Sequence, residues 1–210
     1  MAVTEHEPGV AADGINSTPV IDVQRSHIIV NYRTIDRKSD NLDVPEHGAN
    51  RIAALNLTDG NFAKDADGRD LDRRVEDNPL WNNVHRNRAS LLLDGDHVYV
   101  AFAGRCEIRF WRYGSLNFQG WIYAFDAATL TFQGRYRSTR QENGSASLEP
   151  TEDPTAGGGI WQASTGLAAD GRGSLYFATG NQSMGFQAIT QPADKLGRNC
   201  LLYTSDAADE

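Results

Sequence analysis

The chain has 210 residues, of which 40% are hydrophobic and 23% are charged, a composition that is ordinary for a globular chain. Its formal net charge is −8, which argues against a nucleic-acid partner, because proteins that bind the phosphate backbone present a basic surface. No apolar run approaches the ~18 residues of a membrane span. The acidic, polar residues 1–13 are predicted to be an N-terminal extension, and they show no signal-peptide pattern.

Short segments with the composition of β-strands begin directly after this extension. They are rich in β-branched residues and bounded by turn residues, and they cover residues 17–22, 27–32 and 51–56. Asn56 then predicts a turn, because an Asx side chain can hydrogen-bond to the backbone two residues further on. A short fourth strand is predicted at 60–62.

The same order of strands returns further along the chain. A second set is predicted at residues 90–94, 97–102, 120–126 and 131–136. A third set begins at 166–170 and 174–179. The aspartate that ends the first strand recurs at Asp22, Asp94 and Asp170, which indicates an internal repeat.

A repeat of four antiparallel strands is typical of a propeller blade, and ~4–8 such blades close a ring. The repeat is longer than usual because of four insertions, at residues 33–50, 63–88, 104–119 and 138–158. We therefore expect an all-β fold in which residues 14–199 form a partial β-propeller of four-stranded antiparallel blades. About two and a half blades and no substantial helix are predicted.

The end of the chain is a separate matter. Residues 200–210 match the in-frame translation of a sequencing adapter, so we predict an adapter-derived tail that packs on nothing; an ordinary acidic tail is the alternative. The sequenced DNA fragment, which we expect to be metagenomic, would then end near Asn199. The expected partners of this chain are the missing blades of its own propeller. Without Cys200, Cys106 is the only cysteine, so no internal disulfide is possible.

Four motifs resemble the PQQ-like (pyrroloquinoline quinone) β-propeller repeat family. They are STPVID, AFDAAT, GGGIWQ and ATGN, at residues 17–22, 124–129, 157–162 and 178–181. The resemblance spans residues 14–183 and implies a bacterial protein that is periplasmic or secreted. The family contains quinoprotein alcohol dehydrogenases, an assembly scaffold and many proteins of unknown function. Lys64 and Gly134 stand where the dehydrogenases have a docking Trp, and Leu130 replaces a Gly.

The dehydrogenases of this family hold a flat quinone against a Trp and a calcium ion through oxygen ligands. Carried over by motif, the resemblance implies Trp161 as the cofactor-binding residue and Glu107 and Asn181 as metal ligands. Each has another interpretation: Trp161 packs between blades, Asn181 belongs to a turn, and Glu107 is a solvated loop carboxylate. An EF-hand around Gly68 is excluded, because its first and last ligand positions would be Ala63 and Arg74.

These observations favour a PQQ-like propeller that acts as a non-catalytic scaffold or a ligand-binding module, with a protein or small-molecule ligand as its partner. The alternative is a PQQ- and calcium-dependent alcohol or sugar dehydrogenase, a quinoprotein. The first hypothesis predicts no cofactor. The second requires Trp161, Asn181 and Glu107 to meet at the axis of the propeller.

Overall fold

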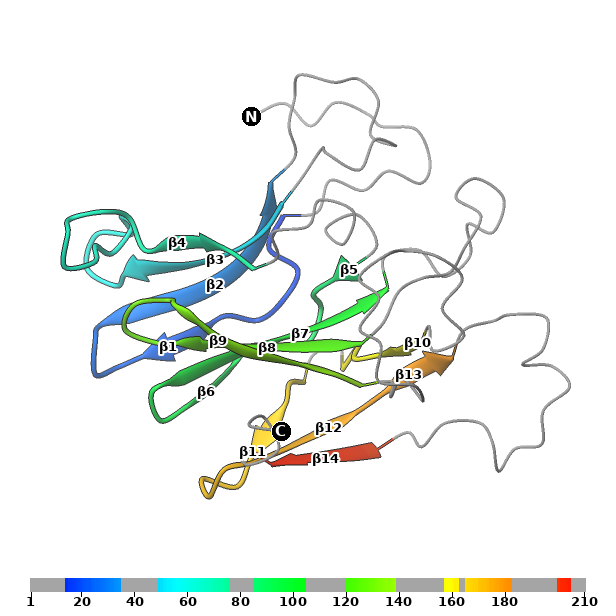
Figure 1. The fold of residues 1–210 in the computed structure, drawn as a ribbon. Coiled ribbons are helices and arrows are strands. Elements are labelled where there is room, and N and C mark those ends of the chain that lie inside the picture. The colour runs from blue at the N-terminus through cyan, green and yellow to red at the C-terminus, as the bar shows by residue number, and fades with distance from the viewer. Residues whose placement is uncertain are drawn as a thin grey trace, which may run out of the picture.

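The computed structural model of the protein describes residues 14–34, 49–75, 85–104, 120–138, 157–162, 165–182 and 200–204. These ranges form strands, turns and bends (Figure 1), and they include no helix long and apolar enough to cross a membrane. Every strand pair is antiparallel. The all-β prediction is therefore confirmed.

The first blade is a four-stranded sheet in which strands adjacent in sequence are adjacent in space. Its strands are β1 (Val20–Asp22), β2 (His27–Thr34), β3 (Ala49–Asn56) and β4 (Asp72–Arg74). The first three strands lie where the sequence predicts them. The fourth does not, because the chain near Phe62 makes only one isolated bridge to β3.

A tight turn displaces the fourth strand. The Asp65 side chain accepts hydrogen bonds from the backbone N–H groups of Asp67 and Arg69, at 3.0 and 2.8 Å. Gly68 adopts a φ of 76°, which a residue with a Cβ tolerates poorly. The chain therefore reverses and returns to β3, where Asp72 accepts a bidentate ion pair from Arg51 at 2.8–3.1 Å.

The second blade repeats this plan, but its first strand is split. The strands are β5 (His85–Arg86), β6 (Leu92–Asp94), β7 (His97–Gly104), β8 (Trp121–Asp126) and β9 (Phe132–Arg137). β5 and β6 both pair with β7, one at each end of it. Together they occupy a single strand position, so the blade has four strand positions. In the break between them, residues 87–91, the side chains of Asn87, Ala89 and Leu91 are buried.

The third blade is split in the same way. Its strands are β10 (Gly157–Gly159), β11 (Ala168–Ala169), β12 (Ser174–Ala178), β13 (Gly180–Gln182) and β14 (Cys200–Thr204). β11 pairs with β12, β10 pairs with β13, and β14 pairs with the free side of β12. Two blades and part of a third are therefore present, as predicted.

The pairing of β14 corrects the prediction that the tail packs on nothing. Cys200–Thr204 lies along β12 in register, with Leu202 opposite Tyr176. The physical reason is that an edge strand presents unpaired N–H and C=O groups, which attract any segment of high β propensity. The adapter origin of residues 200–210 stays a prediction.

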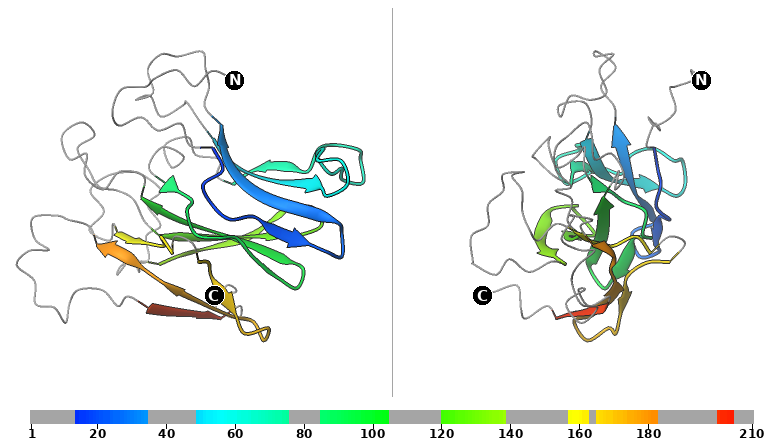
Figure 2. Two further views of the ribbon diagram at one scale, coloured as in Figure 1. Left: turned by 180° about the vertical axis from the view of Figure 1, so that it is seen from behind. Right: turned by 90° about the vertical axis from the view of Figure 1, so that its right-hand side faces the viewer.

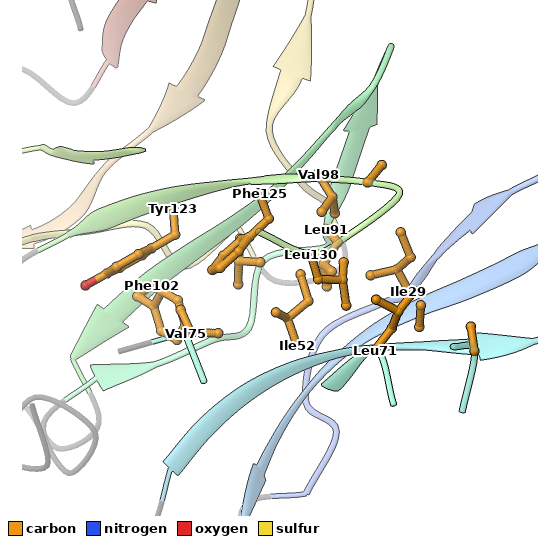
Figure 3. Close-up of a cluster of buried hydrophobic side chains, with 14 of the residues drawn as sticks. Ile29, Ile52, Leu71, Val75, Leu91, Val98, Phe102, Tyr123, Phe125 and Leu130 are labelled. Atoms are coloured by element: carbon orange, nitrogen blue, oxygen red, sulfur yellow. The ribbon is translucent and has the colours of Figure 1, made fainter. Parts of the chain in front are cut away.

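The blades pack face to face, with the second between the other two (Figures 1 and 2). Apolar side chains of the first blade, including Ile29 and Ile52, meet Val98, Phe102 and Phe125 of the second (Figure 3). All five are at most 1% exposed. Alternate residues of a strand share a face, and the face of β7 that carries Val98 and Phe102 packs against the first blade. Its other side faces the third blade through Tyr99 and Ala101.

The segments that lead into β1, β6 and β11, in the three blades, are joined by backbone hydrogen bonds. The N–H of Leu91 donates to Thr18 O at 3.0 Å, and the N–H of Ser90 donates to Thr165 O at 2.9 Å. A Cβ on Gly166 would lie 2.8 Å from Ser90 O, so only glycine permits this approach. These contacts hold the innermost strands side by side, which is the arrangement of strands around a propeller axis.

An ion-pair cluster joins the first two blades at their β-turns. The Arg25 guanidinium donates to Asp22 Oδ2 at 2.8 Å and to Asp96 Oδ1 at 2.6 Å. The carbonyl of Asp96 in turn accepts the N–H of Ala127 at 2.8 Å. Asp22 is 2% exposed, so its charge depends on these partners. Burial by itself raises the pKa of Asp22, but the hydrogen bonds from Arg25 outweigh it and lower the pKa overall.

Substitution of Gly120 tests the contact between the second and third blades. A Cβ at Gly120 would lie 1.9 Å from Gly158 O and 2.3 Å from Ser138 Oγ, so Gly120→Ala forces the blades apart. We expect a loss of about 3 kcal/mol in the free energy of unfolding, measured by urea denaturation. Gly134→Ala is the matched control, because no atom lies within 4 Å of its Cβ position. Equal destabilisation by both substitutions would contradict this packing.

The ion-pair cluster predicts a pH-dependent stability. Asp22→Asn is expected to destabilise the protein by about 2 kcal/mol at pH 7, because Arg25 loses a charged partner. The folded-state pKa of Asp22 lies below its ordinary value of 3.8, so this contribution is present above pH 3.8 and is lost as the pH falls through the lower folded value. Denaturation across this pH range should show the difference shrinking in acid, whereas the exposed control Asp67→Asn should change little at any pH. A constant difference would count against the cluster.

Candidate functional site

The glycine-rich strand β10, which precedes Ile160 and Trp161, contacts the second blade. Gly158 has a φ of 65°, and its carbonyl accepts the Ser138 hydroxyl at 2.6 Å. Two residues later, the N–H of Ile160 donates to Phe102 O at 3.1 Å. The Ile160 side chain is completely buried, in the apolar cluster with Phe177. The strand therefore positions Ile160 as the residue that fills the space between the blades.

Trp161 directly follows Ile160, beyond the end of β10, and its side chain is half-buried. The guanidinium carbon of Arg88 lies over its indole ring, 6.0 Å from the ring centroid. That distance is at the outer limit of a cation–π contact. Arg88 belongs to the break between β5 and β6, so this contact joins the third blade to the second.

Of the other two predicted site residues, Asn181 is among the described residues and Glu107 is not. Asn181 lies within β13, between the residues that pair with Gly157 and Gly159, and therefore opposite Gly158. This pairing brings the Asn181 backbone to the strand that leads into Trp161. Glu107 lies outside the described residues. Within the described ranges, no three His, Cys, Asp or Glu side chains gather in a way that could hold a metal ion.

The contact with Arg88 limits how a flat cofactor could lie against Trp161. A stacked quinone needs an open indole face, and the Arg88 guanidinium lies over one face of this half-buried ring, so the quinone would have to use the other face. We derive no reaction step through a quinone or a metal. Trp161 as a cofactor-binding residue and Trp161 as a packing residue between blades both stay predictions.

A cluster of buried polar residues that was not among the predicted site residues lies between the first and second blades. The strand faces that carry Ile29 on β2 and Ile52 on β3 continue into polar residues: Asn31, Arg33 and Asn50. All three are at most 8% exposed, as is His85 across the interface, which is 0% exposed. The apolar interface therefore has a second polar end, opposite the one formed by Arg25, Asp22 and Asp96.

The polar end surrounds a small, open-mouthed hollow whose enclosed volume of about 10 Å³ has room for about one water molecule. Side chains of both blades line it: Asn31, Arg33 and Asn50 from the first, and His85, Arg86 and Asn87 from the second. The His85 ring packs edge-on against Phe102, with the centroids 6.5 Å apart, so it lies at the boundary with the apolar core. The Asn31 amide donates to Arg51 O at 2.9 Å, which fixes its orientation.

A signal for this site was present in the sequence. In β2, Asn31 and Arg33 continue the two-residue period of Ile29, and in β3 Asn50 continues the period of Ile52 and Ala54. Polar residues on the buried face of a strand are uncommon unless they are satisfied or functional. The sequence predicts an insertion at residues 33–50, so Arg33 and Asn50 fall outside the predicted strands and their period is not apparent.

The architecture defines the chain as part of a β-propeller. No family model matches it, and no curated protein matches it. Among solved structures it is similar to one described as "Europium-containing methanol dehydrogenase", with a TM-score of 0.48 and 12% sequence identity. The similarity covers 82% of this chain and 27% of that protein, so the chain spans about a quarter of its length.

Proposed function

We propose that this chain is part of a PQQ-like β-propeller that acts as a scaffold or ligand-binding module. The observation that carries the proposal is the position of Trp161: it follows the buried Ile160 and contacts Arg88 of the neighbouring blade, so its surroundings are those of a packing residue. The motifs GGGIWQ and ATGN support the repeat family, and the blade geometry accounts for them without a cofactor.

Further blades of the same propeller are the proposed partners of the outer faces. Val20 and Asp22 face the second blade, whereas Ile21 points to the opposite side of the sheet and is 57% exposed. Val23 beside it is 80% exposed. Another blade against this face would bury these side chains in the same way that Ile29 is buried on the other face.

The dehydrogenase alternative has one observation in its favour. The pairing of β10 with β13 brings the Asn181 backbone alongside the glycine-rich strand that precedes Trp161, so two of the three residues implied by the resemblance come from paired strands. If this alternative holds, Trp161, Asn181 and Glu107 are the residues that would hold pyrroloquinoline quinone and calcium, and the cofactor would supply the oxidation chemistry.

Replacement of Trp161 distinguishes the two functions. If Trp161 packs between blades, Trp161→Ala should lower the free energy of unfolding by about 2 kcal/mol, and pyrroloquinoline quinone with calcium should leave the melting temperature of the unmodified chain unchanged. Thermal denaturation with and without the quinone measures both effects. Trp161→Phe is the control, because it retains an aromatic ring and should lose less stability.

The dehydrogenase alternative predicts the reverse pattern. The quinone should then raise the melting temperature of the unmodified chain, and both Trp161→Ala and Asn181→Ala should abolish that rise. Retention of the quinone after gel filtration would add a direct optical measurement. A rise in melting temperature with the quinone, or retention of the quinone after gel filtration, would contradict the scaffold proposal.

A further inference from the structure

We propose that the edge of β12 is a strand-binding site, which accepts an extended apolar segment of a separate polypeptide as the third strand of the third blade, in exchange for β14. The inference rests on the propeller part of the proposed function and involves no cofactor. The side chains that the partner needs are those of the third strands in the other two blades.

β14 occupies the position that the third strand has in the first two blades. In the first blade, Asn56 at the end of β3 lies opposite His27 at the start of β2, and the corresponding ends of β8 and β7 pair in the second blade. In the third blade, Thr204 at the end of β14 lies opposite Ser174 at the start of β12. All three pairs are antiparallel and share this register. The edge of β12 therefore receives a segment as a third strand.

The described pairing holds β14 on one edge only. β3 lies between β2 and β4, and β8 lies between β7 and β9, so each of these third strands is paired on both sides. Within the described residues, β14 pairs with β12 alone. It has 5 residues, against 8 in β3 and 6 in β8. A short strand that is paired on one side loses few hydrogen bonds when it leaves, so β14 is the third strand that another segment can replace.

The two faces of β12 define the side chains that the site accepts. Leu175 and Phe177 share one face and are each 3% exposed, and Phe177 meets Tyr136 of the second blade edge-on, with the ring centroids 6.0 Å apart. Tyr176 points to the other side and is 45% exposed. Residues directly opposite in an antiparallel pair lie on the same face. A bound strand therefore needs apolar residues opposite Leu175 and Phe177, and it tolerates a polar residue opposite Tyr176.

β8 has the pattern that fits these faces. Counted from the paired ends of the strands, Phe125 and Tyr123 hold the positions that would lie opposite Leu175 and Phe177. Both are at most 3% exposed in the second blade. A peptide with the sequence of residues 120–129, GWIYAFDAAT, is therefore the probe for the site.

The first experiment measures the binding of this peptide, labelled with a fluorophore, to the full chain by fluorescence anisotropy. β14 is tethered to β12, so it competes at an effective concentration on the order of mM. Leu201→Pro combined with Leu202→Pro removes two successive N–H groups from β14, and one of the two points at β12 because successive groups face opposite edges. We expect this variant to bind the peptide saturably and about tenfold more tightly than the unmodified chain. Ala207→Pro with Ala208→Pro, beyond the end of β14, is the matched control and should leave the affinity unchanged.

The second experiment tests the face and the place of binding. Tyr123→Lys with Phe125→Lys in the peptide should abolish binding, whereas Ile122→Lys with Ala124→Lys adds the same charge on the opposite face and should preserve most of it. Hydrogen exchange of the unmodified chain, saturated with the peptide, should become faster at residues 200–204 and stay slow at residues 174–178.

Circular dichroism checks that each variant folds. If the variant with prolines in β14 does not fold, the two lysine peptides and hydrogen exchange on the unmodified chain decide. No saturable binding, equal binding of the two lysine peptides, an affinity that folded proline variants leave unchanged, or continued protection of residues 200–204 in the complex would overturn the proposal. The scaffold function is tested separately with the quinone, so failure of the peptide to bind leaves it standing.

Discussion

The burial of one apolar strand face against the next is the interaction on which this structure depends. Each sheet is too small to bury a core by itself, so Ile29 and Ile52 of the first blade are covered by Val98 and Phe102 of the second. Full burial of such side chains is worth about 1.5–3 kcal/mol each, which exceeds the contribution of any ion pair on the surface. Because β7 has two apolar faces, the second blade links its neighbours into one body.

The polar groups between the first and second blades lie at the two ends of their apolar contact. At one end, Arg25 joins Asp22 and Asp96 across the two blades. At the other, Arg33 and His85 lie around a hollow between the same two blades. The positions of these polar groups are therefore set by the packing of the apolar rows.

Trp161 illustrates how a motif and its surroundings can indicate different roles. The glycine-rich strand before it belongs to the resemblance to PQQ-like repeats, and a quinone site would use the same residues. In the structure, the glycines permit close approach to Ser138 and direct Ile160 into the core, and Arg88 covers one side of the indole. The same local sequence therefore has a sufficient explanation in the assembly of the blades.

The strand order, the hairpin turns and the repeat were determined by the sequence alone, because they depend on local patterns: alternating apolar residues, and turns fixed by side chains such as Asp126, which accepts the N–H groups of Ala128 and Thr129. Three features were decided only by the tertiary structure. They are the return of Asp72–Arg74 to β3, the pairing of Cys200–Thr204 with β12, and the placement of Arg33 and His85 around one small hollow. Each joins segments that are distant in the chain, and local propensity does not specify which edge or face a segment will meet. The physical reason is that such contacts form only when two blades have packed and their apolar rows have fixed the relative positions of the polar ends.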